Sequence, residues 1–228
     1  MKTKTAHSRD LLTYLLSEPL HGARKAYVQV IADDGNLAID PLTSGEPLLV
    51  SGQLQYFEKQ GPPARTLEVK DGQMNLTIRG SRSQRPWIHF PWSACNAAHE
   101  WRIQLNPAIS MDLLAHSGGG NVKLDLAGTT LTSISAATGG GNIDVILPDA
   151  LTDLNADFNT GAGNLTIQLP VGVEARIHGE SGLGKVIVDS KFKMTAEKTY
   201  QSDGYDHTGK KVTIKATSGV GNVTISIR

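Results

Sequence analysis

The stretch "GESGLGKV", Gly179 to Val186, is the part of this sequence that most resembles a site for chemistry. It fills seven of the eight positions of the pattern G-x-x-x-x-G-K-[ST], in which glycines turn around phosphates, a lysine contacts them and a hydroxyl binds magnesium. The eighth position is Val186, which cannot bind a metal. A phosphate-binding lysine opens a helix, whereas "KVIVDSKFK" is β-branched and alternating, which favours a strand. We therefore expect no nucleotide to bind here.

A second cluster of reactive side chains lies in "SRSQRPWIHFPWSACNAAHEW". It contains His89, Cys95 and His99, which are ligand types that borderline metals accept. Their irregular spacing and the lack of a fourth ligand favour a structural role, so we expect no metal and no cofactor. Trp87 and Trp92 lie in the same stretch. They are candidate anchors for a protein partner, because tryptophan contributes strongly to interfaces.

The elements that position these segments follow from an internal repeat. The motif [ST]-G-x-G-[NK] begins at residues 117, 138, 160, 181 and 218, with successive spacings of 21, 22, 21 and 37 residues. Behind each copy apolar residues alternate with polar ones, as at Val122, Leu124 and Leu126, which indicates strands with one buried face. One repeat is therefore two short strands and a glycine turn, and it buries its apolar row only by stacking on other copies.

This repeat predicts an all-β solenoid over residues 101–228, built from two-strand repeats of about 21 residues. The turn asparagines should form an amide ladder. These are Asn121, Asn142, Asn164 and Asn222. Stacking should also place Lys123 beside Asp144 on the outer face, as a cross-strand pair of opposite charge.

The long last spacing predicts a polar excursion from the stack at about residues 190–211, because 37 minus 21 leaves 16 additional residues. A loop or hairpin is expected there, leaving after Asp189 and returning at Val212. Its Tyr200, Tyr205 and His207 are further candidates for a partner surface. The alternative is an ordinary polar loop with its tyrosines packed underneath.

The first hundred residues are less regular. Residues 26–100 contain degenerate rungs, with a hairpin at Asp71-Gly72, followed by the connector rich in tryptophan and histidine. Residues 1–25 are expected to form an N-terminal cap with a short helix over residues 10–17, which ends before Pro19. This helix would either cap the open end of the solenoid or dock on a partner. Four leucines define the apolar face of this helix: Leu11, Leu12, Leu15 and Leu16.

Composition narrows the function classes. Twenty-two basic residues balance 22 acidic ones among 228, so no net charge draws the protein to nucleic acid, and no nucleic-acid partner is expected. A single cysteine, Cys95, cannot form an internal disulfide. No apolar run approaches the roughly 20 residues of a membrane span, and charged residues interrupt any signal-like start. We therefore expect a cytoplasmic protein without an integral membrane segment.

Three stretches carry a resemblance to a known family: "HSGGGNVKLDLAGTTLTSISAATGGGNIDVILPD", "GAGNLTIQLP" and "TIKATSGVGNVTISIR". They resemble the toastrack-type domains of bacteria, and in particular the C-terminal domain of LiaF-like proteins of the cell-wall-active antibiotic response, which are often labelled as adhesins. The resemblance covers about residues 100–228 and extends toward Ala26. It implies a right-handed β-helix-like fold, a non-enzymatic role and a link to envelope-stress signalling.

Two function classes follow. The first is a non-enzymatic interaction or scaffold module for a protein partner, with association between copies also open because solenoid ends expose strand edges. The second is a polysaccharide-binding or polysaccharide-acting β-helix. Aligned turns place Asp112 in a column with Ser133, Asn155, Arg176 and Thr213, and they place Asp157 in a column with Leu114, Ser135, His178 and Lys215. The paired carboxylates that hydrolysis needs are therefore not evident, and we expect no enzyme.

Overall fold

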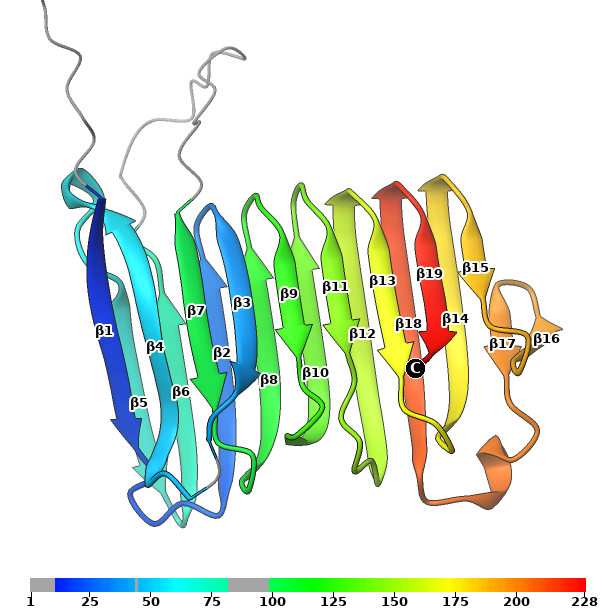
Figure 1. Ribbon diagram of the computed structural model, residues 1–228, viewed down its shortest axis with the longest axis horizontal. Coiled ribbons are helices and arrows are strands. Elements are labelled where there is room, and N and C mark those ends of the chain that lie inside the picture. The colour runs from blue at the N-terminus through cyan, green and yellow to red at the C-terminus, as the bar shows by residue number, and fades with distance from the viewer. Residues whose placement is uncertain (1–10, 44, 82–98) are drawn as a thin grey trace, which may run out of the picture.

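The computed structural model describes residues 11–43, 45–81 and 99–228. Within these residues almost all of the regular structure is β-strand, arranged in two sheets that face each other across one apolar core (Figure 1). The all-β prediction is confirmed. The two 3-10 turns are η1 (Glu58–Gln60) and η2 (Tyr205–His207). No helix in these ranges is long and apolar enough to cross a membrane.

The strands of each sheet follow one another along the long axis of Figure 1. In this spatial order, sheet A consists of β1 (Leu11–Pro19), β4 (Leu48–Phe57), β7 (Glu100–Leu105), β3 (Asn36–Pro41), β9 (Val122–Asp125), β11 (Ile143–Ile146), β13 (Leu165–Leu169), β19 (Val223–Ile227) and β15 (Val186–Val188). Sheet B consists of β5 (Ala64–Lys70), β6 (Gln73–Arg79), β2 (Lys25–Ala32), β8 (Ser110–Ser117), β10 (Thr130–Thr138), β12 (Asp153–Ala162), β18 (Lys211–Val220), β14 (Glu174–Leu183), β17 (Thr199–Gln201) and β16 (Lys193–Ala196).

Each rung is one strand of sheet B, a glycine turn and one strand of sheet A, as in β10–β11. Neighbouring rungs pair in parallel, and their alternating side chains point to the core and to solvent. The predicted columns are confirmed, because Ser133 lies opposite both Asp112 and Asn155. Lys123 lies opposite Asp144, as expected. The handedness of the winding stays a prediction.

The glycine turns allow the backbones of neighbouring rungs to approach more closely than side chains would permit. Gly141 has φ of 137°, and a Cβ built on it would lie 2.3 Å from the carbonyl oxygen of Gly120. The first glycine of the same turn, Gly139, would likewise place a Cβ 2.4 Å from the carbonyl oxygen of Gly118. The glycines of the motif are therefore required by contact between turns as well as by local conformation.

Side chains of the motif complete the contact between turns. The Thr138 hydroxyl donates to the carbonyl oxygen of Gly120 at 2.9 Å. The backbone N–H of Asn142 donates to the side-chain oxygen Oδ1 of Asn121 at 2.9 Å. The same two bonds recur along the stack, so the predicted amide ladder is confirmed. The ladder starts at Asn36 and ends at Lys185. The backbone amide of Lys185 donates to Oδ1 of Asn222, but the lysine side chain has no acceptor that could continue the ladder.

The spatial order of the rungs differs from their order in the chain. The C-terminal rung, β18–β19, lies between β12–β13 and β14–β15, as the red strands of Figure 1 show. The predicted excursion does leave the stack after β15, but it returns inside the stack rather than at its end. Val186 is in register with Val223 as expected, but it is only half-buried because β15 is the last strand of sheet A.

The predicted N-terminal helix over residues 10–17 is wrong, because residues 11–17 belong to β1, which pairs antiparallel with β4. Leucines four residues apart, such as Leu12 and Leu16, fit one face of a strand as well as one stripe of a helix. Pairing with a distant strand decided between the two: Leu16 and Glu18 point inward and are buried, whereas Leu15 points outward and is exposed. Glu18 contacts Arg65 of β5 and thereby ties the edge of sheet A to the edge of sheet B.

We predict that Gly141→Ala destabilises the fold by about 3 kcal/mol or more, because the new methyl group clashes with the Gly120 carbonyl and its φ suits only glycine. Gly140→Ala is the matched control, since no atom lies within 4 Å of a Cβ at that position. Urea unfolding of both variants measures the difference. Equal stability of the two would contradict the contact between turns.

We also predict that Asn142→Ala lowers the free energy of unfolding by about 1 kcal/mol, because the Asn164 amide loses its acceptor at 2.8 Å. Lys185→Asn should stay within about 0.5 kcal/mol of the wild type, since it restores the motif at the last rung. The check is the urea midpoint of each variant at constant slope. A larger effect at Lys185 than at Asn142 would show that the ladder does not end there.

Candidate interaction surface

The excursion at residues 190–210 folds as a small, well-anchored cap on the end of the stack that β14 and β15 form, which we call the C-terminal end. Its strands β16 and β17 form a hairpin, and β17 pairs antiparallel with β14. This pairing places Tyr200 opposite Ile177 and covers part of the open edge of sheet B. Phe192 is buried against the core at the start of the excursion. The expected hairpin is confirmed.

Tyr205 is the central side chain of the cap, and it is only 5% exposed. Its hydroxyl lies 2.6 Å from the Thr213 hydroxyl on β18. The Arg176 guanidinium lies 4.4 Å from the ring centroid, a cation–π contact, and the Lys211 ammonium lies 5.3 Å from it. Tyr205 was a candidate for a partner surface, but its ring is enclosed, as in the alternative of a tyrosine packed under the loop.

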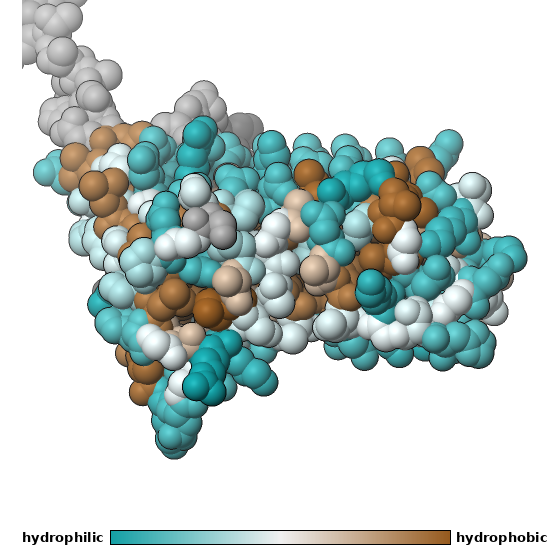
Figure 2. Space-filling model, turned by 60° about the horizontal axis from the view of Figure 1, so that its bottom comes forward, coloured by the Kyte–Doolittle hydropathy of each residue, from teal (hydrophilic) through white to brown (hydrophobic). Residues whose placement is uncertain are grey.

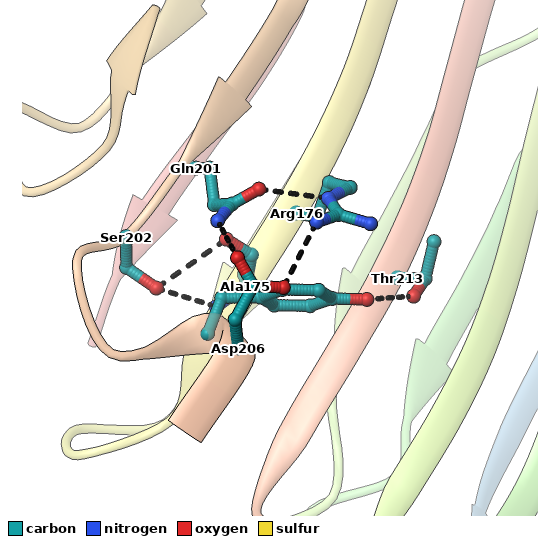
Figure 3. A network of polar contacts seen from close by, with 7 residues as sticks. Ala175, Arg176, Gln201, Ser202, Asp206 and Thr213 are labelled. Carbon is teal, nitrogen blue, oxygen red and sulfur yellow. Dashed lines mark hydrogen bonds and ion pairs between the residues drawn. The ribbon is translucent and has the colours of Figure 1, made fainter. Parts of the chain in front are cut away.

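Polar side chains fix the cap to β14 (Figure 3). Arg176 donates to Gln201 at 2.8 Å and to Asp206 at 3.1 Å, and Gln201 donates to the second carboxylate oxygen of Asp206 at 2.9 Å. The Ser202 hydroxyl accepts from the Ala175 amide at 2.9 Å and donates back to its carbonyl at 3.3 Å. This closed network holds the turn η2 in one geometry.

Three ion pairs surround this network. Lys193 lies 2.7 Å from Asp203, Lys198 lies 2.6 Å from Glu180 and Lys191 lies 3.3 Å from Glu174. The hydrogen bond from Lys198 holds the pKa of Glu180 below its ordinary value.

Glu174 is the most enclosed of the three carboxylates. A hydrogen bond from Ser202, supported by Lys191 and the Gly204 amide, holds the pKa of Glu174 below its ordinary value, although partial burial opposes this shift. Its ionised form therefore stabilises the cap.

The remaining candidates for a partner surface differ in position. Tyr200 is half-buried and packs against the core, whereas His207 is exposed. Trp87 and Trp92 lie outside the described residues. Met194, on the outer strand of the cap, is 64% exposed.

The row of middle residues in the glycine turns also carries exposed apolar side chains at this end. Leu183 is 72% exposed and its register partner Val220 is 51% exposed. Figure 2 shows hydrophobic residues on the surface near both ends of the stack. Sequence reasoning missed the Leu183–Val220 pair because it treated the variable position of the motif as neutral.

The segment from Gly179 to Val186 contains a turn between two strands and does not open a helix. β14 runs to Leu183 and β15 begins at Val186, so strand flanks the turn on both sides. Gly184 approaches Gly221 of the neighbouring turn, and the Lys185 amide is bonded to Asn222. This arrangement agrees with the expectation of a glycine corner.

The histidine cluster is only partly described, because His89 and Cys95 lie outside the described residues. His99 is buried and packs edge-on against Phe57 at a centroid distance of 5.6 Å. Burial lowers the pKa of His99, against the charges of Asp34 and Asp33, which raise it. In the described ranges no three residues of metal-ligating type gather at one point.

Acidic residues lie two rungs apart on sheet B and on adjacent rungs of sheet A. On sheet B, Lys211 lies between Asp153 and Glu174 in register and separates the two carboxylates. On sheet A, the register of β3 on β9 directs Asp40 toward Asp125, a pair that the alignment of the regular turns could not include. Neither acid lines the two most marked hollows of the described surface, one of which encloses only about 40 Å³.

We predict that Glu174→Gln destabilises the protein at pH 7 and that its difference from the wild type is smaller at pH 3. The folded pKa of Glu174 is depressed, so its contribution is present above the ordinary value of 4.5 and is lost as the pH falls through the folded pKa. Urea unfolding at both pH values measures this. Glu68→Gln, at an exposed position on β5, is the control. A pH-independent difference between Glu174→Gln and the wild type would contradict the assigned role.

Comparisons with known proteins agree with this architecture. The matching family is described as the N-terminal domain of toast_rack, DUF2154, and its model covers residues 3–168 of 228. No functionally curated protein matches the chain.

Solved structures give a fold comparison. A proposed cell adhesion protein from Clostridium sporogenes is 24% identical, with a TM-score of 0.85 over 96% of this chain and 100% of that chain. A proposed adhesin from Bacteroides fragilis is 13% identical, with a TM-score of 0.33 over 96% of this chain and 98% of that chain. The first structure shares the two-sheet fold, and the family model covers more than half of the sequence, so this chain belongs to the toast_rack family.

Proposed function

We propose that this protein is a non-enzymatic interaction module that binds a protein partner at the C-terminal end of its stack. The observation that carries the proposal is the row of middle residues in the glycine turns, whose side chains grow toward that end. In spatial order the row is Gly119, Gly140, Ala162, Val220 and Leu183. The last two side chains are large, apolar, adjacent and exposed.

A single exposed hydrophobic side chain on a surface needs no explanation. Val220 and Leu183 differ because they lie side by side in register and their backbone is held by the contacts between turns. Ile187, on the neighbouring edge strand, is also exposed. A rigid backbone loses little conformational entropy on binding, which favours the use of such side chains as contacts.

Three features support a non-enzymatic role. The outer columns of sheet B separate Asp153 from Glu174 by a lysine. The Arg176, Gln201 and Asp206 side chains bond one another and so are occupied in holding the cap. Two hollows on the described surface are each lined by a single acid, Asp71 in one and Asp33 in the other. A polysaccharide-acting protein would need a cleft that holds paired acids.

The cellular context is part of the same proposal. Membership of the toast_rack family, together with the resemblance to LiaF-like proteins, supports a role in cell-envelope stress signalling. The expected cytoplasmic location stays a prediction.

The proposal is tested by affinity capture. The purified protein is immobilised and exposed to an extract of its host cells, including solubilised membranes, and bound proteins are quantified by mass spectrometry. We expect Leu183→Ser with Val220→Ser to reduce capture of the specific partner at least about tenfold, because buried apolar contacts dominate interface energetics.

Leu15→Ser is the matched control, because Leu15 is also 72% exposed but lies on β1 at the opposite end of the stack. It should leave capture unchanged. Equal capture by the double variant and by Leu15→Ser would remove the C-terminal end from consideration as the binding surface.

A further inference from the structure

The C-terminal rung occupies a position that its place in the chain does not explain. β14–β15 follow β12–β13 in the chain, yet β18–β19 separate the two rungs in space. The strands β12 and β14 are synthesised before β18, and both carry the same repeat. The two earlier rungs are therefore available to stack on each other before the last rung exists.

The contacts between turns fit both arrangements. In the structure, Asn164 accepts from the Asn222 amide at 2.9 Å, and Asn222 accepts from the Lys185 amide at 3.0 Å. Gly219 approaches the Gly161 carbonyl, and Gly182 approaches the Gly219 carbonyl, in the same way. The contact between two neighbouring rungs is here called a joint. The joint on one side of β18–β19 repeats the joint on the other side, so removal of this middle rung would leave two matching surfaces.

The core rows are also compatible with direct stacking. Leu154 would meet Ala175, and Phe158 would meet Gly179, each a large side chain against a small one. In the structure Phe158 lies beside Ala216, which is also small. Core packing therefore does not specify that β18 must lie between β12 and β14.

Charge disfavours direct stacking. Lys211 lies opposite both Asp153 and Glu174 in register, and direct stacking would bring these two carboxylates side by side. Lys215 lies opposite Asp157 on one side and His178 on the other. The charges of Asp153 and Glu174 therefore favour insertion of the rung β18–β19 between them, and this preference does not depend on which molecule supplies the rung.

The connection to this rung is short and lies at the surface. The cap is anchored to β14 through Ser202 and Arg176, and the chain then passes through residues 208–210 to β18. In this short segment Gly209 has no atom within 4 Å of a Cβ position and Lys210 is exposed. A short connection next to a self-contained element is the geometry from which strand exchange arises.

We propose that β18–β19 is exchanged between two copies of this chain, so that the C-terminal rung of one copy inserts between β12–β13 and β14–β15 of the other. The exchanged dimer contains the same contacts as the single chain at every joint. It differs only in the path of residues 208–210, so concentration decides between the two forms, with a crossover near the millimolar effective concentration of a short linker, about 1 mM.

The test uses full-length chains that carry Cys95→Ser and one new cysteine each. Asn155→Cys lies on β12 and Thr213→Cys lies on β18, and these positions are register partners on the outer face. Equal amounts are mixed, carried through the urea transition and back, and oxidised. A disulfide between the two chains requires the β18 strand of one copy to lie beside the β12 strand of the other.

We expect a disulfide-linked dimer whose yield rises at least about tenfold between 10 µM and 1 mM protein. A mixture of Ser133→Cys with Asn155→Cys is the matched control, since these partners on β10 and β12 remain within one chain. A chain carrying both Asn155→Cys and Thr213→Cys shows that the joint can be oxidised. The proposal is overturned if that chain closes its disulfide while the mixture gives no linked dimer, or if the control mixture links equally.

Discussion

The whole structure depends on the close approach of one glycine turn to the next. A Cβ at the last glycine of the motif, such as Gly141, would lie between 2.0 and 2.3 Å from a carbonyl oxygen in the neighbouring turn, so no other residue fits. The same approach brings a serine or threonine hydroxyl and an asparagine side chain within hydrogen-bonding distance of the next backbone. The glycines, the hydroxyl and the asparagine of the motif [ST]-G-x-G-N therefore each serve the contact between two neighbouring turns.

A contact that repeats identically makes the rungs interchangeable. The backbone contacts of the glycine turns are alike from one pair of neighbouring rungs to the next, and the core rows alternate large and small residues in ways that fit more than one neighbour. Weaker and more local features then favour one order of the rungs, such as the repulsion between Asp153 and Glu174 that direct stacking of their strands would create. This explains how the last rung of the chain lies inside the stack.

The two ends of the stack solve the problem of open edges differently. At the N-terminal end, β1 and β5 pair antiparallel with their neighbours, and the Glu18–Arg65 ion pair joins the two sheets. At the C-terminal end, the hairpin of β16 and β17 covers β14 and is fixed by Tyr205 and Arg176. The edge strand β15 is very short and has no partner beyond it in the described chain, so exposed Leu183 and Val220 lie beside an end that is only partly covered.

The sequence by itself determined the strands of the regular rungs, the register of their columns, the asparagine ladder and the existence of the excursion, because a two-residue period and a spaced glycine motif are local properties. It also predicted a strand rather than a helix after Lys185, since β-branched residues follow it, and β15 lies there. Only the tertiary structure decided that residues 11–19 form a strand, because the leucine pattern fits a helix equally well until β4 provides a partner. The burial of Tyr205 and the insertion of β18–β19 were likewise beyond the sequence, since both depend on charges and surfaces that distant segments supply once the chain has folded.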